Sequence, residues 1–230
     1  MKSIPETAVR KDVHMLITGK EGLVLIGDKQ IRFLNQRSFD WTHPYEYPAE
    51  PGATLKSAGC GIFSACIAAE KMSGKRISVE GLADFSCREG GRGDDGTDRP
   101  ALLTALEKSG LAREYGFRYD GLGLQNDHDK LWETLSNGGC ALCNLRRGHI
   151  VCLINTRIKD GEKQVLAVDP HSESADARIT DQVREVVLTS EVVSPTKNAS
   201  GVHTGYQTTY GVFWVPLTLP RDFNLLYPVE

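Results

Sequence analysis

The sequence predicts an α+β protein in which helices precede an antiparallel sheet. Helical periodicity is concentrated in the first two thirds of the 230 residues, and β-rich runs follow the glycine pair at 138–139. Short alternating runs joined by tight turns also lie near the start of the chain. Segregation of helices from strands along the chain is typical of the α+β class.

The first third contains short strands, a loop and a helix. Residues 14–36 alternate apolar and polar side chains around two glycine-containing turns, which predicts short strands. Residues 40–59 are rich in proline and glycine and predict an ordered loop. From Cys60 to Met72 the apolar residues recur at helical spacing, and Gly74 follows as a stop signal.

Three further helices are expected before the sheet. Ser78 is a suitable N-cap for a helix running to about Cys87, and a glycine- and charge-rich loop follows it. Thr97 or Asp98 caps the next helix, with a proline tolerated in its first turn. The last expected helix spans about residues 127–136.

The remaining expected elements are strands. A Lys-Asp-Gly-Glu turn at 159–162 predicts a hairpin. The β-rich runs are residues 140–146, 149–158, 163–169, 184–192 and 208–217.

Composition excludes some classes of function. The chain is 40% hydrophobic and 25% charged, as expected for a globular protein with a substantial core. The net charge of −3 gives no electrostatic reason to expect a nucleic acid or an anionic membrane as partner. No apolar run reaches the length of a membrane helix, and the first residues lack the apolar core of a secretion signal. We therefore expect a cytoplasmic protein, or a secreted one if a signal peptide has been removed.

The sequence has six cysteines, and several lie inside apolar patterns where free thiols are common. We therefore expect reduced thiols, although an even number also permits disulfides. Cys140 and Cys143 have CxxC spacing, and a zinc site would add His149 and Cys152. Strand alternation places Cys140 and Cys152 on the opposite face from Cys143 and His149, which disfavours zinc. The six are Cys60, Cys66, Cys87, Cys140, Cys143 and Cys152.

Cys60 lies between two glycines in the segment SAGCGIFSAC, at the start of the first expected helix. The partial positive charge and unpaired N–H groups of a helix N-terminus favour a thiolate and can stabilise an oxyanion. Gly59 and Gly61 would let a substrate backbone approach closely. The alternative is that Cys60 is a small buried core residue.

His149 begins an apolar strand, and Asp169 ends the strand that returns after the 159–162 turn. Both residues are expected near the open end of that hairpin, where a bulge or the twist of the sheet can absorb a register mismatch of a few residues. An aspartate beside a histidine fixes the tautomer of the ring and stabilises the imidazolium. The alternatives are a solvated edge histidine and a turn-initiating Asp-Pro pair.

Five blocks of the sequence stand out together: NQRSFDWTHPYEY, TLKSAGCGIFSACIAAEKMSGKRISVEGLADF, DGTDRPALLTALEKSGL, GGCALCNLRRGHIVCLI and VLAVDPHSES. Together they resemble the papain-like bacterial cysteine peptidases related to the bacteriocin-leader (double-glycine) peptidases. Their order and approximate spacing match the family over about residues 33–175.

The resemblance implies a papain-like fold over residues 33–230, preceded by an N-terminal β extension at 1–32. In that fold a helical lobe carries the nucleophile on its central helix and packs on an antiparallel sheet that carries the base. Cys60 matches the nucleophile, His149 the general base and Asp169 the residue that orients the base. Gln36 matches the glutamine that opens the family's domain and often helps to form the oxyanion hole.

The resemblance further implies a thioester mechanism on a peptide or protein substrate, with no cofactor and no metal. Gln36 departs from the closest leader peptidases, because it lies 24 residues before Cys60 rather than a few. The first 30 residues and the segment 175–208 match no family feature. An acyl transferase or deamidase, and a peptide-binding module without turnover, are alternatives on the same fold; oligomeric state is open.

Other motifs have simpler interpretations. Arg92-Gly93-Asp94 is an adhesion tripeptide, but a flexible surface loop is the preferred interpretation, and nearby aspartates do not match a calcium loop. His171 is expected to be a solvated turn residue. Trp41 and Tyr45 either line a cleft or, more commonly for such aromatics, hold a loop against the core.

Overall fold

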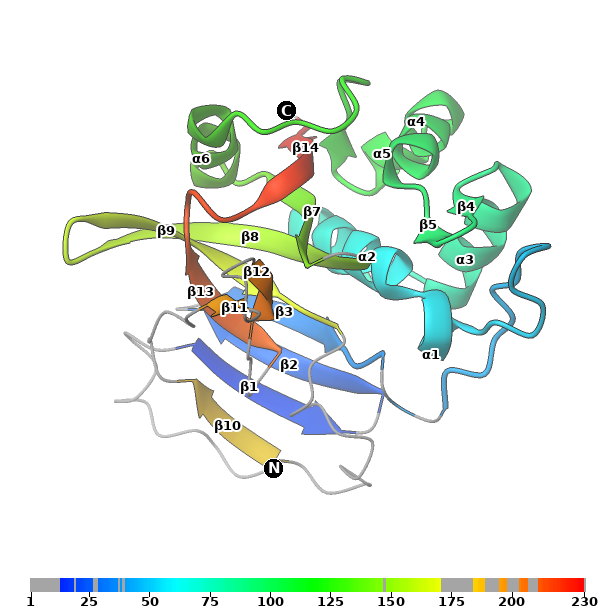
Figure 1. The fold of residues 1–230 in the computed structure, drawn as a ribbon, viewed down its shortest axis with the longest axis horizontal. Coiled ribbons are helices and arrows are strands. Elements are labelled where there is room, and N and C mark those ends of the chain that lie inside the picture. The colour runs from blue at the N-terminus through cyan, green and yellow to red at the C-terminus, as the bar shows by residue number, and fades with distance from the viewer. Residues whose placement is uncertain are drawn as a thin grey trace.

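The computed structural model describes residues 13–18, 20–26, 29–36, 38, 40–146, 148–170, 184–188, 195–197, 203–206 and 211–229. Its main sheet is antiparallel and six-stranded, in the order β13-β9-β8-β7-β14-β6, which confirms the α+β class (Figure 1). The strands are β6 (Phe117–Arg118), β7 (Cys140–Arg146), β8 (His149–Lys159), β9 (Glu162–Val168), β13 (Val212–Pro216) and β14 (Arg221–Pro228).

The hairpin of β8 and β9 forms as expected. Lys159 pairs with Glu162, and the two residues between them have positive φ angles of 51° and 81°, as a two-residue hairpin turn requires. A shift of register between Leu153 and Asn155 supplies the expected bulge. The bulge shifts the register of the residue pairs between the turn and the open end of the hairpin, where His149 and Asp169 lie.

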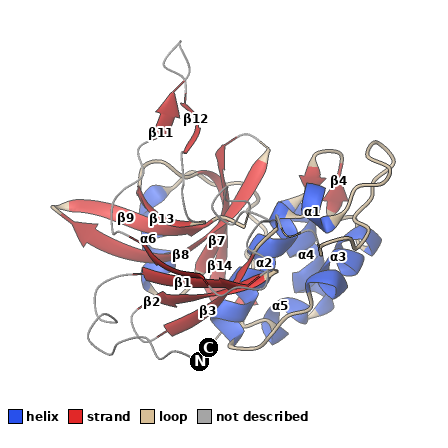
Figure 2. Cartoon of the chain, turned by 90° about the horizontal axis from the view of Figure 1, so that it is seen from below, coloured by secondary structure: helices blue, strands red, loops and turns tan. Residues whose placement is uncertain are grey.

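Six helices are described: α1 (Leu55–Ala58), α2 (Cys60–Ser73), α3 (Val79–Arg88), α4 (Arg99–Ser109), α5 (Leu111–Glu114) and α6 (His128–Ser136). The expected caps of α3 and α4 are confirmed, and α6 has a cap that was not expected. The side chains of Ser78, Asp98 and Asp127 each accept a backbone N–H at the start of α3, α4 and α6. Figure 2 shows α1 to α5 gathered beside the sheets, with α6 apart from them.

Two apolar clusters lie on opposite faces of the main sheet. On one face, Cys140 and Cys152 pack with residues of α2, α3 and α4. On the other, Cys143 and Val151 pack with Leu131 and Leu135 of α6. This alternation is that of strands covered on both sides, and it fixes α2 as the helix that faces the start of β8.

A second antiparallel sheet has the order β10-β1-β2-β3. It contains β1 (Val13–Thr18), β2 (Glu21–Ile26) and β3 (Lys29–Leu34), as expected from the N-terminal turns, and β10 (Arg184–Leu188). β3 therefore runs through the expected boundary at residue 32, and the segment 175–208 contributes a strand to the N-terminal sheet. In Figure 1, β3 lies between β2 and α2.

Several short elements were not expected from the sequence. α1 lies in the 40–59 stretch that predicts a loop, and β4 (Arg92–Gly93) pairs with β5 (Gly96–Thr97) where a loop was also expected. The other unexpected elements are α5, β6, β14 and the pair β11 (Pro195–Lys197) and β12 (His203–Tyr206). Among the described residues, no helix combines the length and the apolar character needed to cross a membrane.

Candidate active site

Cys60 is the first residue of α2 and is 9% exposed. A helix of this length presents a partial positive charge at its N-terminus, where an anionic sulfur is stabilised. α1 ends at Ala58, so Gly59 alone separates the two helices. The sequence predicted the helix start at Cys60, but not the helical turn that precedes it.

The glycines beside Cys60 serve the protein's own packing. A Cβ atom on Gly59 would lie 2.4 Å from the carbonyl oxygen of Leu55, and one on Gly61 would lie 2.4 Å from the Cβ of Thr97. Real Cβ atoms do not approach other atoms so closely. The expectation that these glycines leave room for a substrate backbone is therefore wrong, because Leu55 and Thr97 already occupy the space.

His149 is paired with Asp169. The two side chains are 8% and 10% exposed, and Nε2 of His149 lies 2.5 Å from Oδ1 of Asp169. Burial lowers the pKa of His149, but hydrogen bonds to Asp169 and to Cys60 outweigh burial and raise the pKa to about 9. Since Nε2 faces the carboxylate, Nδ1 is the ring nitrogen left to exchange a proton with the thiol.

Ser64 fixes the position of the nucleophile helix relative to the histidine strand. It lies one helical turn after Cys60, on the same face of α2, and its hydroxyl donates to the carbonyl of Ile150 at 3.1 Å in the buried interior. Ile150 follows His149 in β8. Sequence reasoning missed Ser64, although a serine in an otherwise apolar helix, four residues after Cys60, was a usable signal.

The backbone of Asp169 is held by the residue that precedes β13. Its backbone N–H donates to the carbonyl of Gly211, the residue before that strand. Gly211 has a φ of 48°, and a Cβ there would lie 2.7 Å from the Phe33 ring. The packing of β3 against the turn before β13 thus helps to set the position of Asp169.

Gln36 lies next to both halves of this arrangement. Its backbone N–H donates to the carbonyl of Pro170 at 2.9 Å, and its side-chain Nε2 donates to the carbonyl of Lys56 at 3.0 Å. Pro170 follows Asp169, and Lys56 precedes Cys60 by one helical turn. The side chain is 2% exposed, and its Oε1 is buried without a hydrogen-bond partner in the described structure. The amide has a second N–H beyond the one that Lys56 accepts.

The Arg92–Thr97 segment is an ordered hairpin rather than the expected flexible loop. Arg92 is 3% exposed, donates to the carbonyl oxygens of Tyr45 and Gly96, and pairs with Glu50. The arginine of the adhesion tripeptide is therefore not presented to a partner. Thr97 accepts or donates a hydrogen bond of 2.9 Å with the Tyr45 hydroxyl, which holds the hairpin beside Gly61.

Trp41 and Tyr45 hold their loop against the core. Both are buried, and the indole N–H of Trp41 donates to the carbonyl of Asn35. The Trp41 and Phe63 rings pack edge to face, with their centres 4.9 Å apart. This outcome matches the commoner of the two interpretations of these aromatics. His171, by contrast, lies outside the described residues.

The six cysteines are free thiols in this structure. The two cysteines of the CxxC spacing face opposite sides of the sheet, so they cannot bind the same metal ion. Within the described part of the chain, no three His, Cys, Asp or Glu side chains converge as a metal site would require. Burial raises the pKa of Cys66 and, to about 12, that of Cys143.

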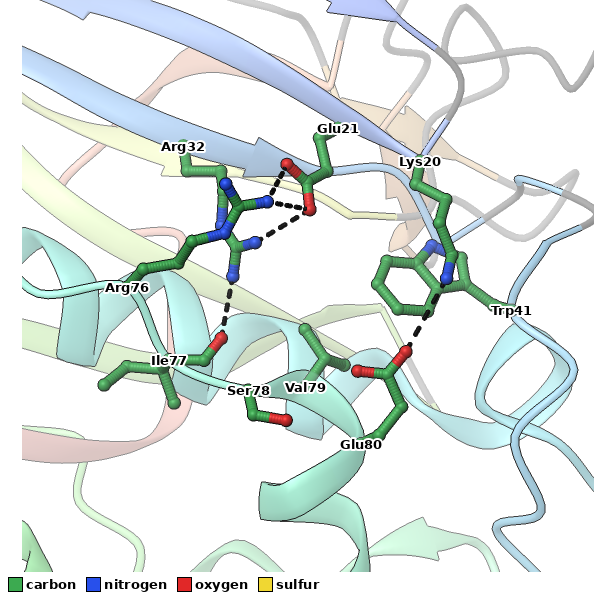
Figure 3. Close-up of a pocket in the computed structure, with 9 residues that line it drawn as sticks. All are labelled: Lys20, Glu21, Arg32, Trp41, Arg76, Ile77, Ser78, Val79 and Glu80. Atoms are coloured by element: carbon green, nitrogen blue, oxygen red, sulfur yellow. Dashed lines mark hydrogen bonds and ion pairs between the residues drawn. The ribbon is translucent and has the colours of Figure 1, made fainter.

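A pocket of about 390 Å³ lies between the N-terminal sheet and α3 (Figure 3). Its charged residues pair with one another: Arg32 and Arg76 both bind Glu21, and Lys20 lies 3.6 Å from Glu80 and 4.0 Å from the centre of the Trp41 ring. Arg32 also pairs with Glu70 of α2. These contacts join the N-terminal sheet to the helices.

The thiol, imidazole and carboxylate that the sequence singled out thus lie together, with Gln36 beside them. No protein-family model, no curated protein and no solved structure matches this chain.

Proposed function

We propose that this protein is a papain-like cysteine hydrolase that cleaves a peptide or related amide bond through a thioester. The support is chemical and geometric. Nε2 of His149 lies 2.5 Å from Oδ1 of Asp169, and Cys60 acts together with this carboxylate to raise the pKa of the imidazole; this arrangement carries the proposal. The arrangement of a nucleophile at the start of a helix and a base on the facing antiparallel sheet also suits the papain-like fold.

The reaction follows from the positions of these groups. The Cys60 sulfur attacks the substrate carbonyl, and the oxygen becomes an oxyanion near the start of α2. Protonated His149 gives its proton to the leaving amine as the C–N bond breaks, which leaves a thioester. His149 then takes a proton from water as the water attacks the thioester, and the C–S bond breaks to release a thiolate, which regenerates the starting thiolate and imidazolium.

Asp169 and Gln36 have supporting roles in this mechanism. The Asp169 carboxylate stabilises the imidazolium and holds the ring with Nδ1 toward the thiol. The free N–H of the Gln36 amide is a donor for the oxyanion, and its contact with Lys56 holds it near the helix start. Both roles require the side chains to be rigid, as their burial indicates.

Selective alkylation tests the proposal. Iodoacetamide should modify Cys60 at pH 7 at least 10-fold faster than it modifies a cysteine peptide, because an adjacent imidazolium favours the reactive thiolate. Cys87 is exposed, so the experiment uses a Cys87→Ser background and peptide mapping. His149→Ala should remove the acceleration. Cys66→Ala is the matched control, since that thiol is fully buried on the same helix.

Turnover is tested with a mixed peptide library and mass spectrometry. We expect cleavage products with the wild-type protein and none with Cys60→Ala, with both proteins melting at similar temperatures. Products that gain an added amine instead of water would identify acyl transfer. If Cys60 reacts no faster than the cysteine peptide and no product depends on it, the proposed function is wrong.

A further inference from the structure

Arg99 is a buried arginine that forms no ion pair with any acidic residue in the described part of the chain. It is the first residue of α4 and is only 5% exposed. Its Nη1 donates to the backbone carbonyl of Leu142 in β7 at 2.8 Å, and among the described residues this is its only hydrogen bond. A buried guanidinium normally pairs with a carboxylate, because a single neutral carbonyl offsets little of its desolvation.

Two described carboxylates, those of Asp98 and Asp222, act on the charge of Arg99 but form their hydrogen bonds with other residues. Asp98 caps α4 by accepting the N–H of Ala101, and Asp222 accepts a side-chain N–H of Asn126. Neither forms an ion pair with Arg99 within the described structure. The guanidinium has five N–H donors, and the structure describes a hydrogen bond from one of its nitrogens.

Arg99 also lies close to the candidate nucleophile. Thr97, two residues earlier, packs on Gly61, and the guanidinium is in electrostatic range of the Cys60 sulfur. The positive charge therefore lies between the start of α2 and β7.

A polar group of β7 near Arg99 and the histidine has an oxygen without a hydrogen-bond partner among the described residues. Asn144 pairs across the sheet with Ile150, the neighbour of His149, and follows Leu142 by two residues. Its Oδ1 is buried without a hydrogen-bond partner in the described part of the chain. Rotation of this amide would present its NH₂ group instead. A buried polar atom without a hydrogen-bond partner, such as this Oδ1, is rare in folded proteins. Beside the buried charge of Arg99, whose one described partner is a neutral carbonyl, it indicates a polar ligand.

We propose that Arg99 binds a carboxylate of the substrate, so that the enzyme acts on amide bonds close to a free carboxylate. This inference rests on the proposed function and names its substrate class. The planar fork of an arginine matches a carboxylate with two parallel hydrogen bonds. The carboxylate is either a C-terminal one or an Asp or Glu side chain, and both present the same chemistry.

Paired alkylating probes test the proposal and separate the two sources. The first pair is N-bromoacetyl-glycine and N-bromoacetyl-glycinamide, which differ in a terminal carboxylate. The second pair is the bromoacetyl derivatives of glutamic acid amide and glutamine amide, which differ in a side-chain carboxylate. In each case the Cys60 sulfur forms a C–S bond and bromide leaves. The measured quantity is the acid-to-amide ratio of the rates at Cys60, in the Cys87→Ser background.

We expect the acid probe of one pair to react at least 10-fold faster than its amide in the wild type. Arg99→Gln should lower that ratio about 10-fold, and Arg99→Lys should lower it less, because the charge remains but the fork is lost. Arg113→Gln, at an exposed position of α5, is the matched control and should keep the wild-type ratio. The His149 imidazolium attracts acids in all these proteins, so the difference between variants isolates Arg99.

Equal ratios in the wild type and Arg99→Gln for both pairs would overturn the proposal. If Arg99→Gln does not fold, the wild-type protein alone tests the proposal. An acid-to-amide rate ratio of one or less for both probe pairs would then overturn it. Failure of the proposed function has a different signature, in which the neutral probes modify Cys60 no faster than a free cysteine peptide.

Discussion

The two ends of helix α2 both carry buried charge, but they differ in how that charge is satisfied. Near the C-terminal end, the Glu70 carboxylate accepts hydrogen bonds from Arg32 and from the backbone N–H of Ile77, and Arg32 also pairs with Glu21. At the N-terminal end, Arg99 has only one carbonyl partner, and the Oε1 of Gln36 has none in the described structure.

This difference separates structural charge from functional charge. A network in which each charge has a partner within the protein joins two parts of the fold and has no remaining capacity for a ligand. Groups that remain unsatisfied cost free energy in the folded protein, and they persist where a ligand or a reaction uses them. The comparison therefore predicts that substitutions at Glu70 change stability, whereas substitutions around Cys60 change reactivity.

The largest effect is expected for Asp169→Asn. The amide cannot stabilise the His149 imidazolium and favours the wrong ring tautomer, so kcat should fall about 10³- to 10⁴-fold. The measurement is cleavage of a peptide that the wild type cleaves, with the melting temperature as control. A loss below 10-fold in a folded variant would mean that Asp169 does not orient the base.

Glu70→Gln tests the other end of the helix. It leaves Arg32 buried with less opposing charge, and breaking a buried ion pair costs about 3–5 kcal/mol. Urea unfolding should show this loss, while the rate of Cys60 alkylation by iodoacetamide stays near the wild-type rate. A change in the alkylation rate of Cys60 without a change in the free energy of unfolding would contradict the assignment of stability to the C-terminal end of α2 and reactivity to its N-terminal end.

Gln36→Ala distinguishes oxyanion stabilisation from packing. Removing one oxyanion donor typically lowers kcat about 10²-fold. Alkylation by iodoacetamide forms no oxyanion, so its rate at Cys60 should not change. Equal losses in turnover and alkylation would show that Gln36 supports the position of Cys60 instead.

The sequence predicted most of the fold, because caps, periodicity and turn residues act locally. Ser78, Asp98 and the Asp160-Gly161 turn each have their effect within four residues. α1 and the β4–β5 hairpin were missed because their stability comes from distant contacts. Arg92, for example, is held by Tyr45 and Glu50, which lie more than 40 residues earlier.

The candidate site was predictable in part for the same reason. His149 and Asp169 lie on one hairpin, so counting along its two arms brings them together, and the observed bulge absorbs the mismatch. The partners of Gln36 and Arg99 are carbonyl groups of the backbone, on Lys56 and Leu142. Any residue type supplies such a carbonyl, so no sequence pattern marks these contacts.

The smallest predicted effect is the pH dependence of stability that His149 contributes. Its pKa is raised from 6.5 to about 9 on folding, so its contribution is fully present below pH 6.5 and is lost as the pH rises through 9. At pH 7 it corresponds to about 2 kcal/mol. The difference in unfolding free energy between wild type and His149→Gln should therefore shrink by about that amount from pH 7 to 9.5, in urea titrations. A difference independent of pH would mean that the folded protein does not hold His149 as an imidazolium. The paired charge at the N-terminal end of α2 would then be absent, and the mechanism would have to begin from a neutral thiol and imidazole.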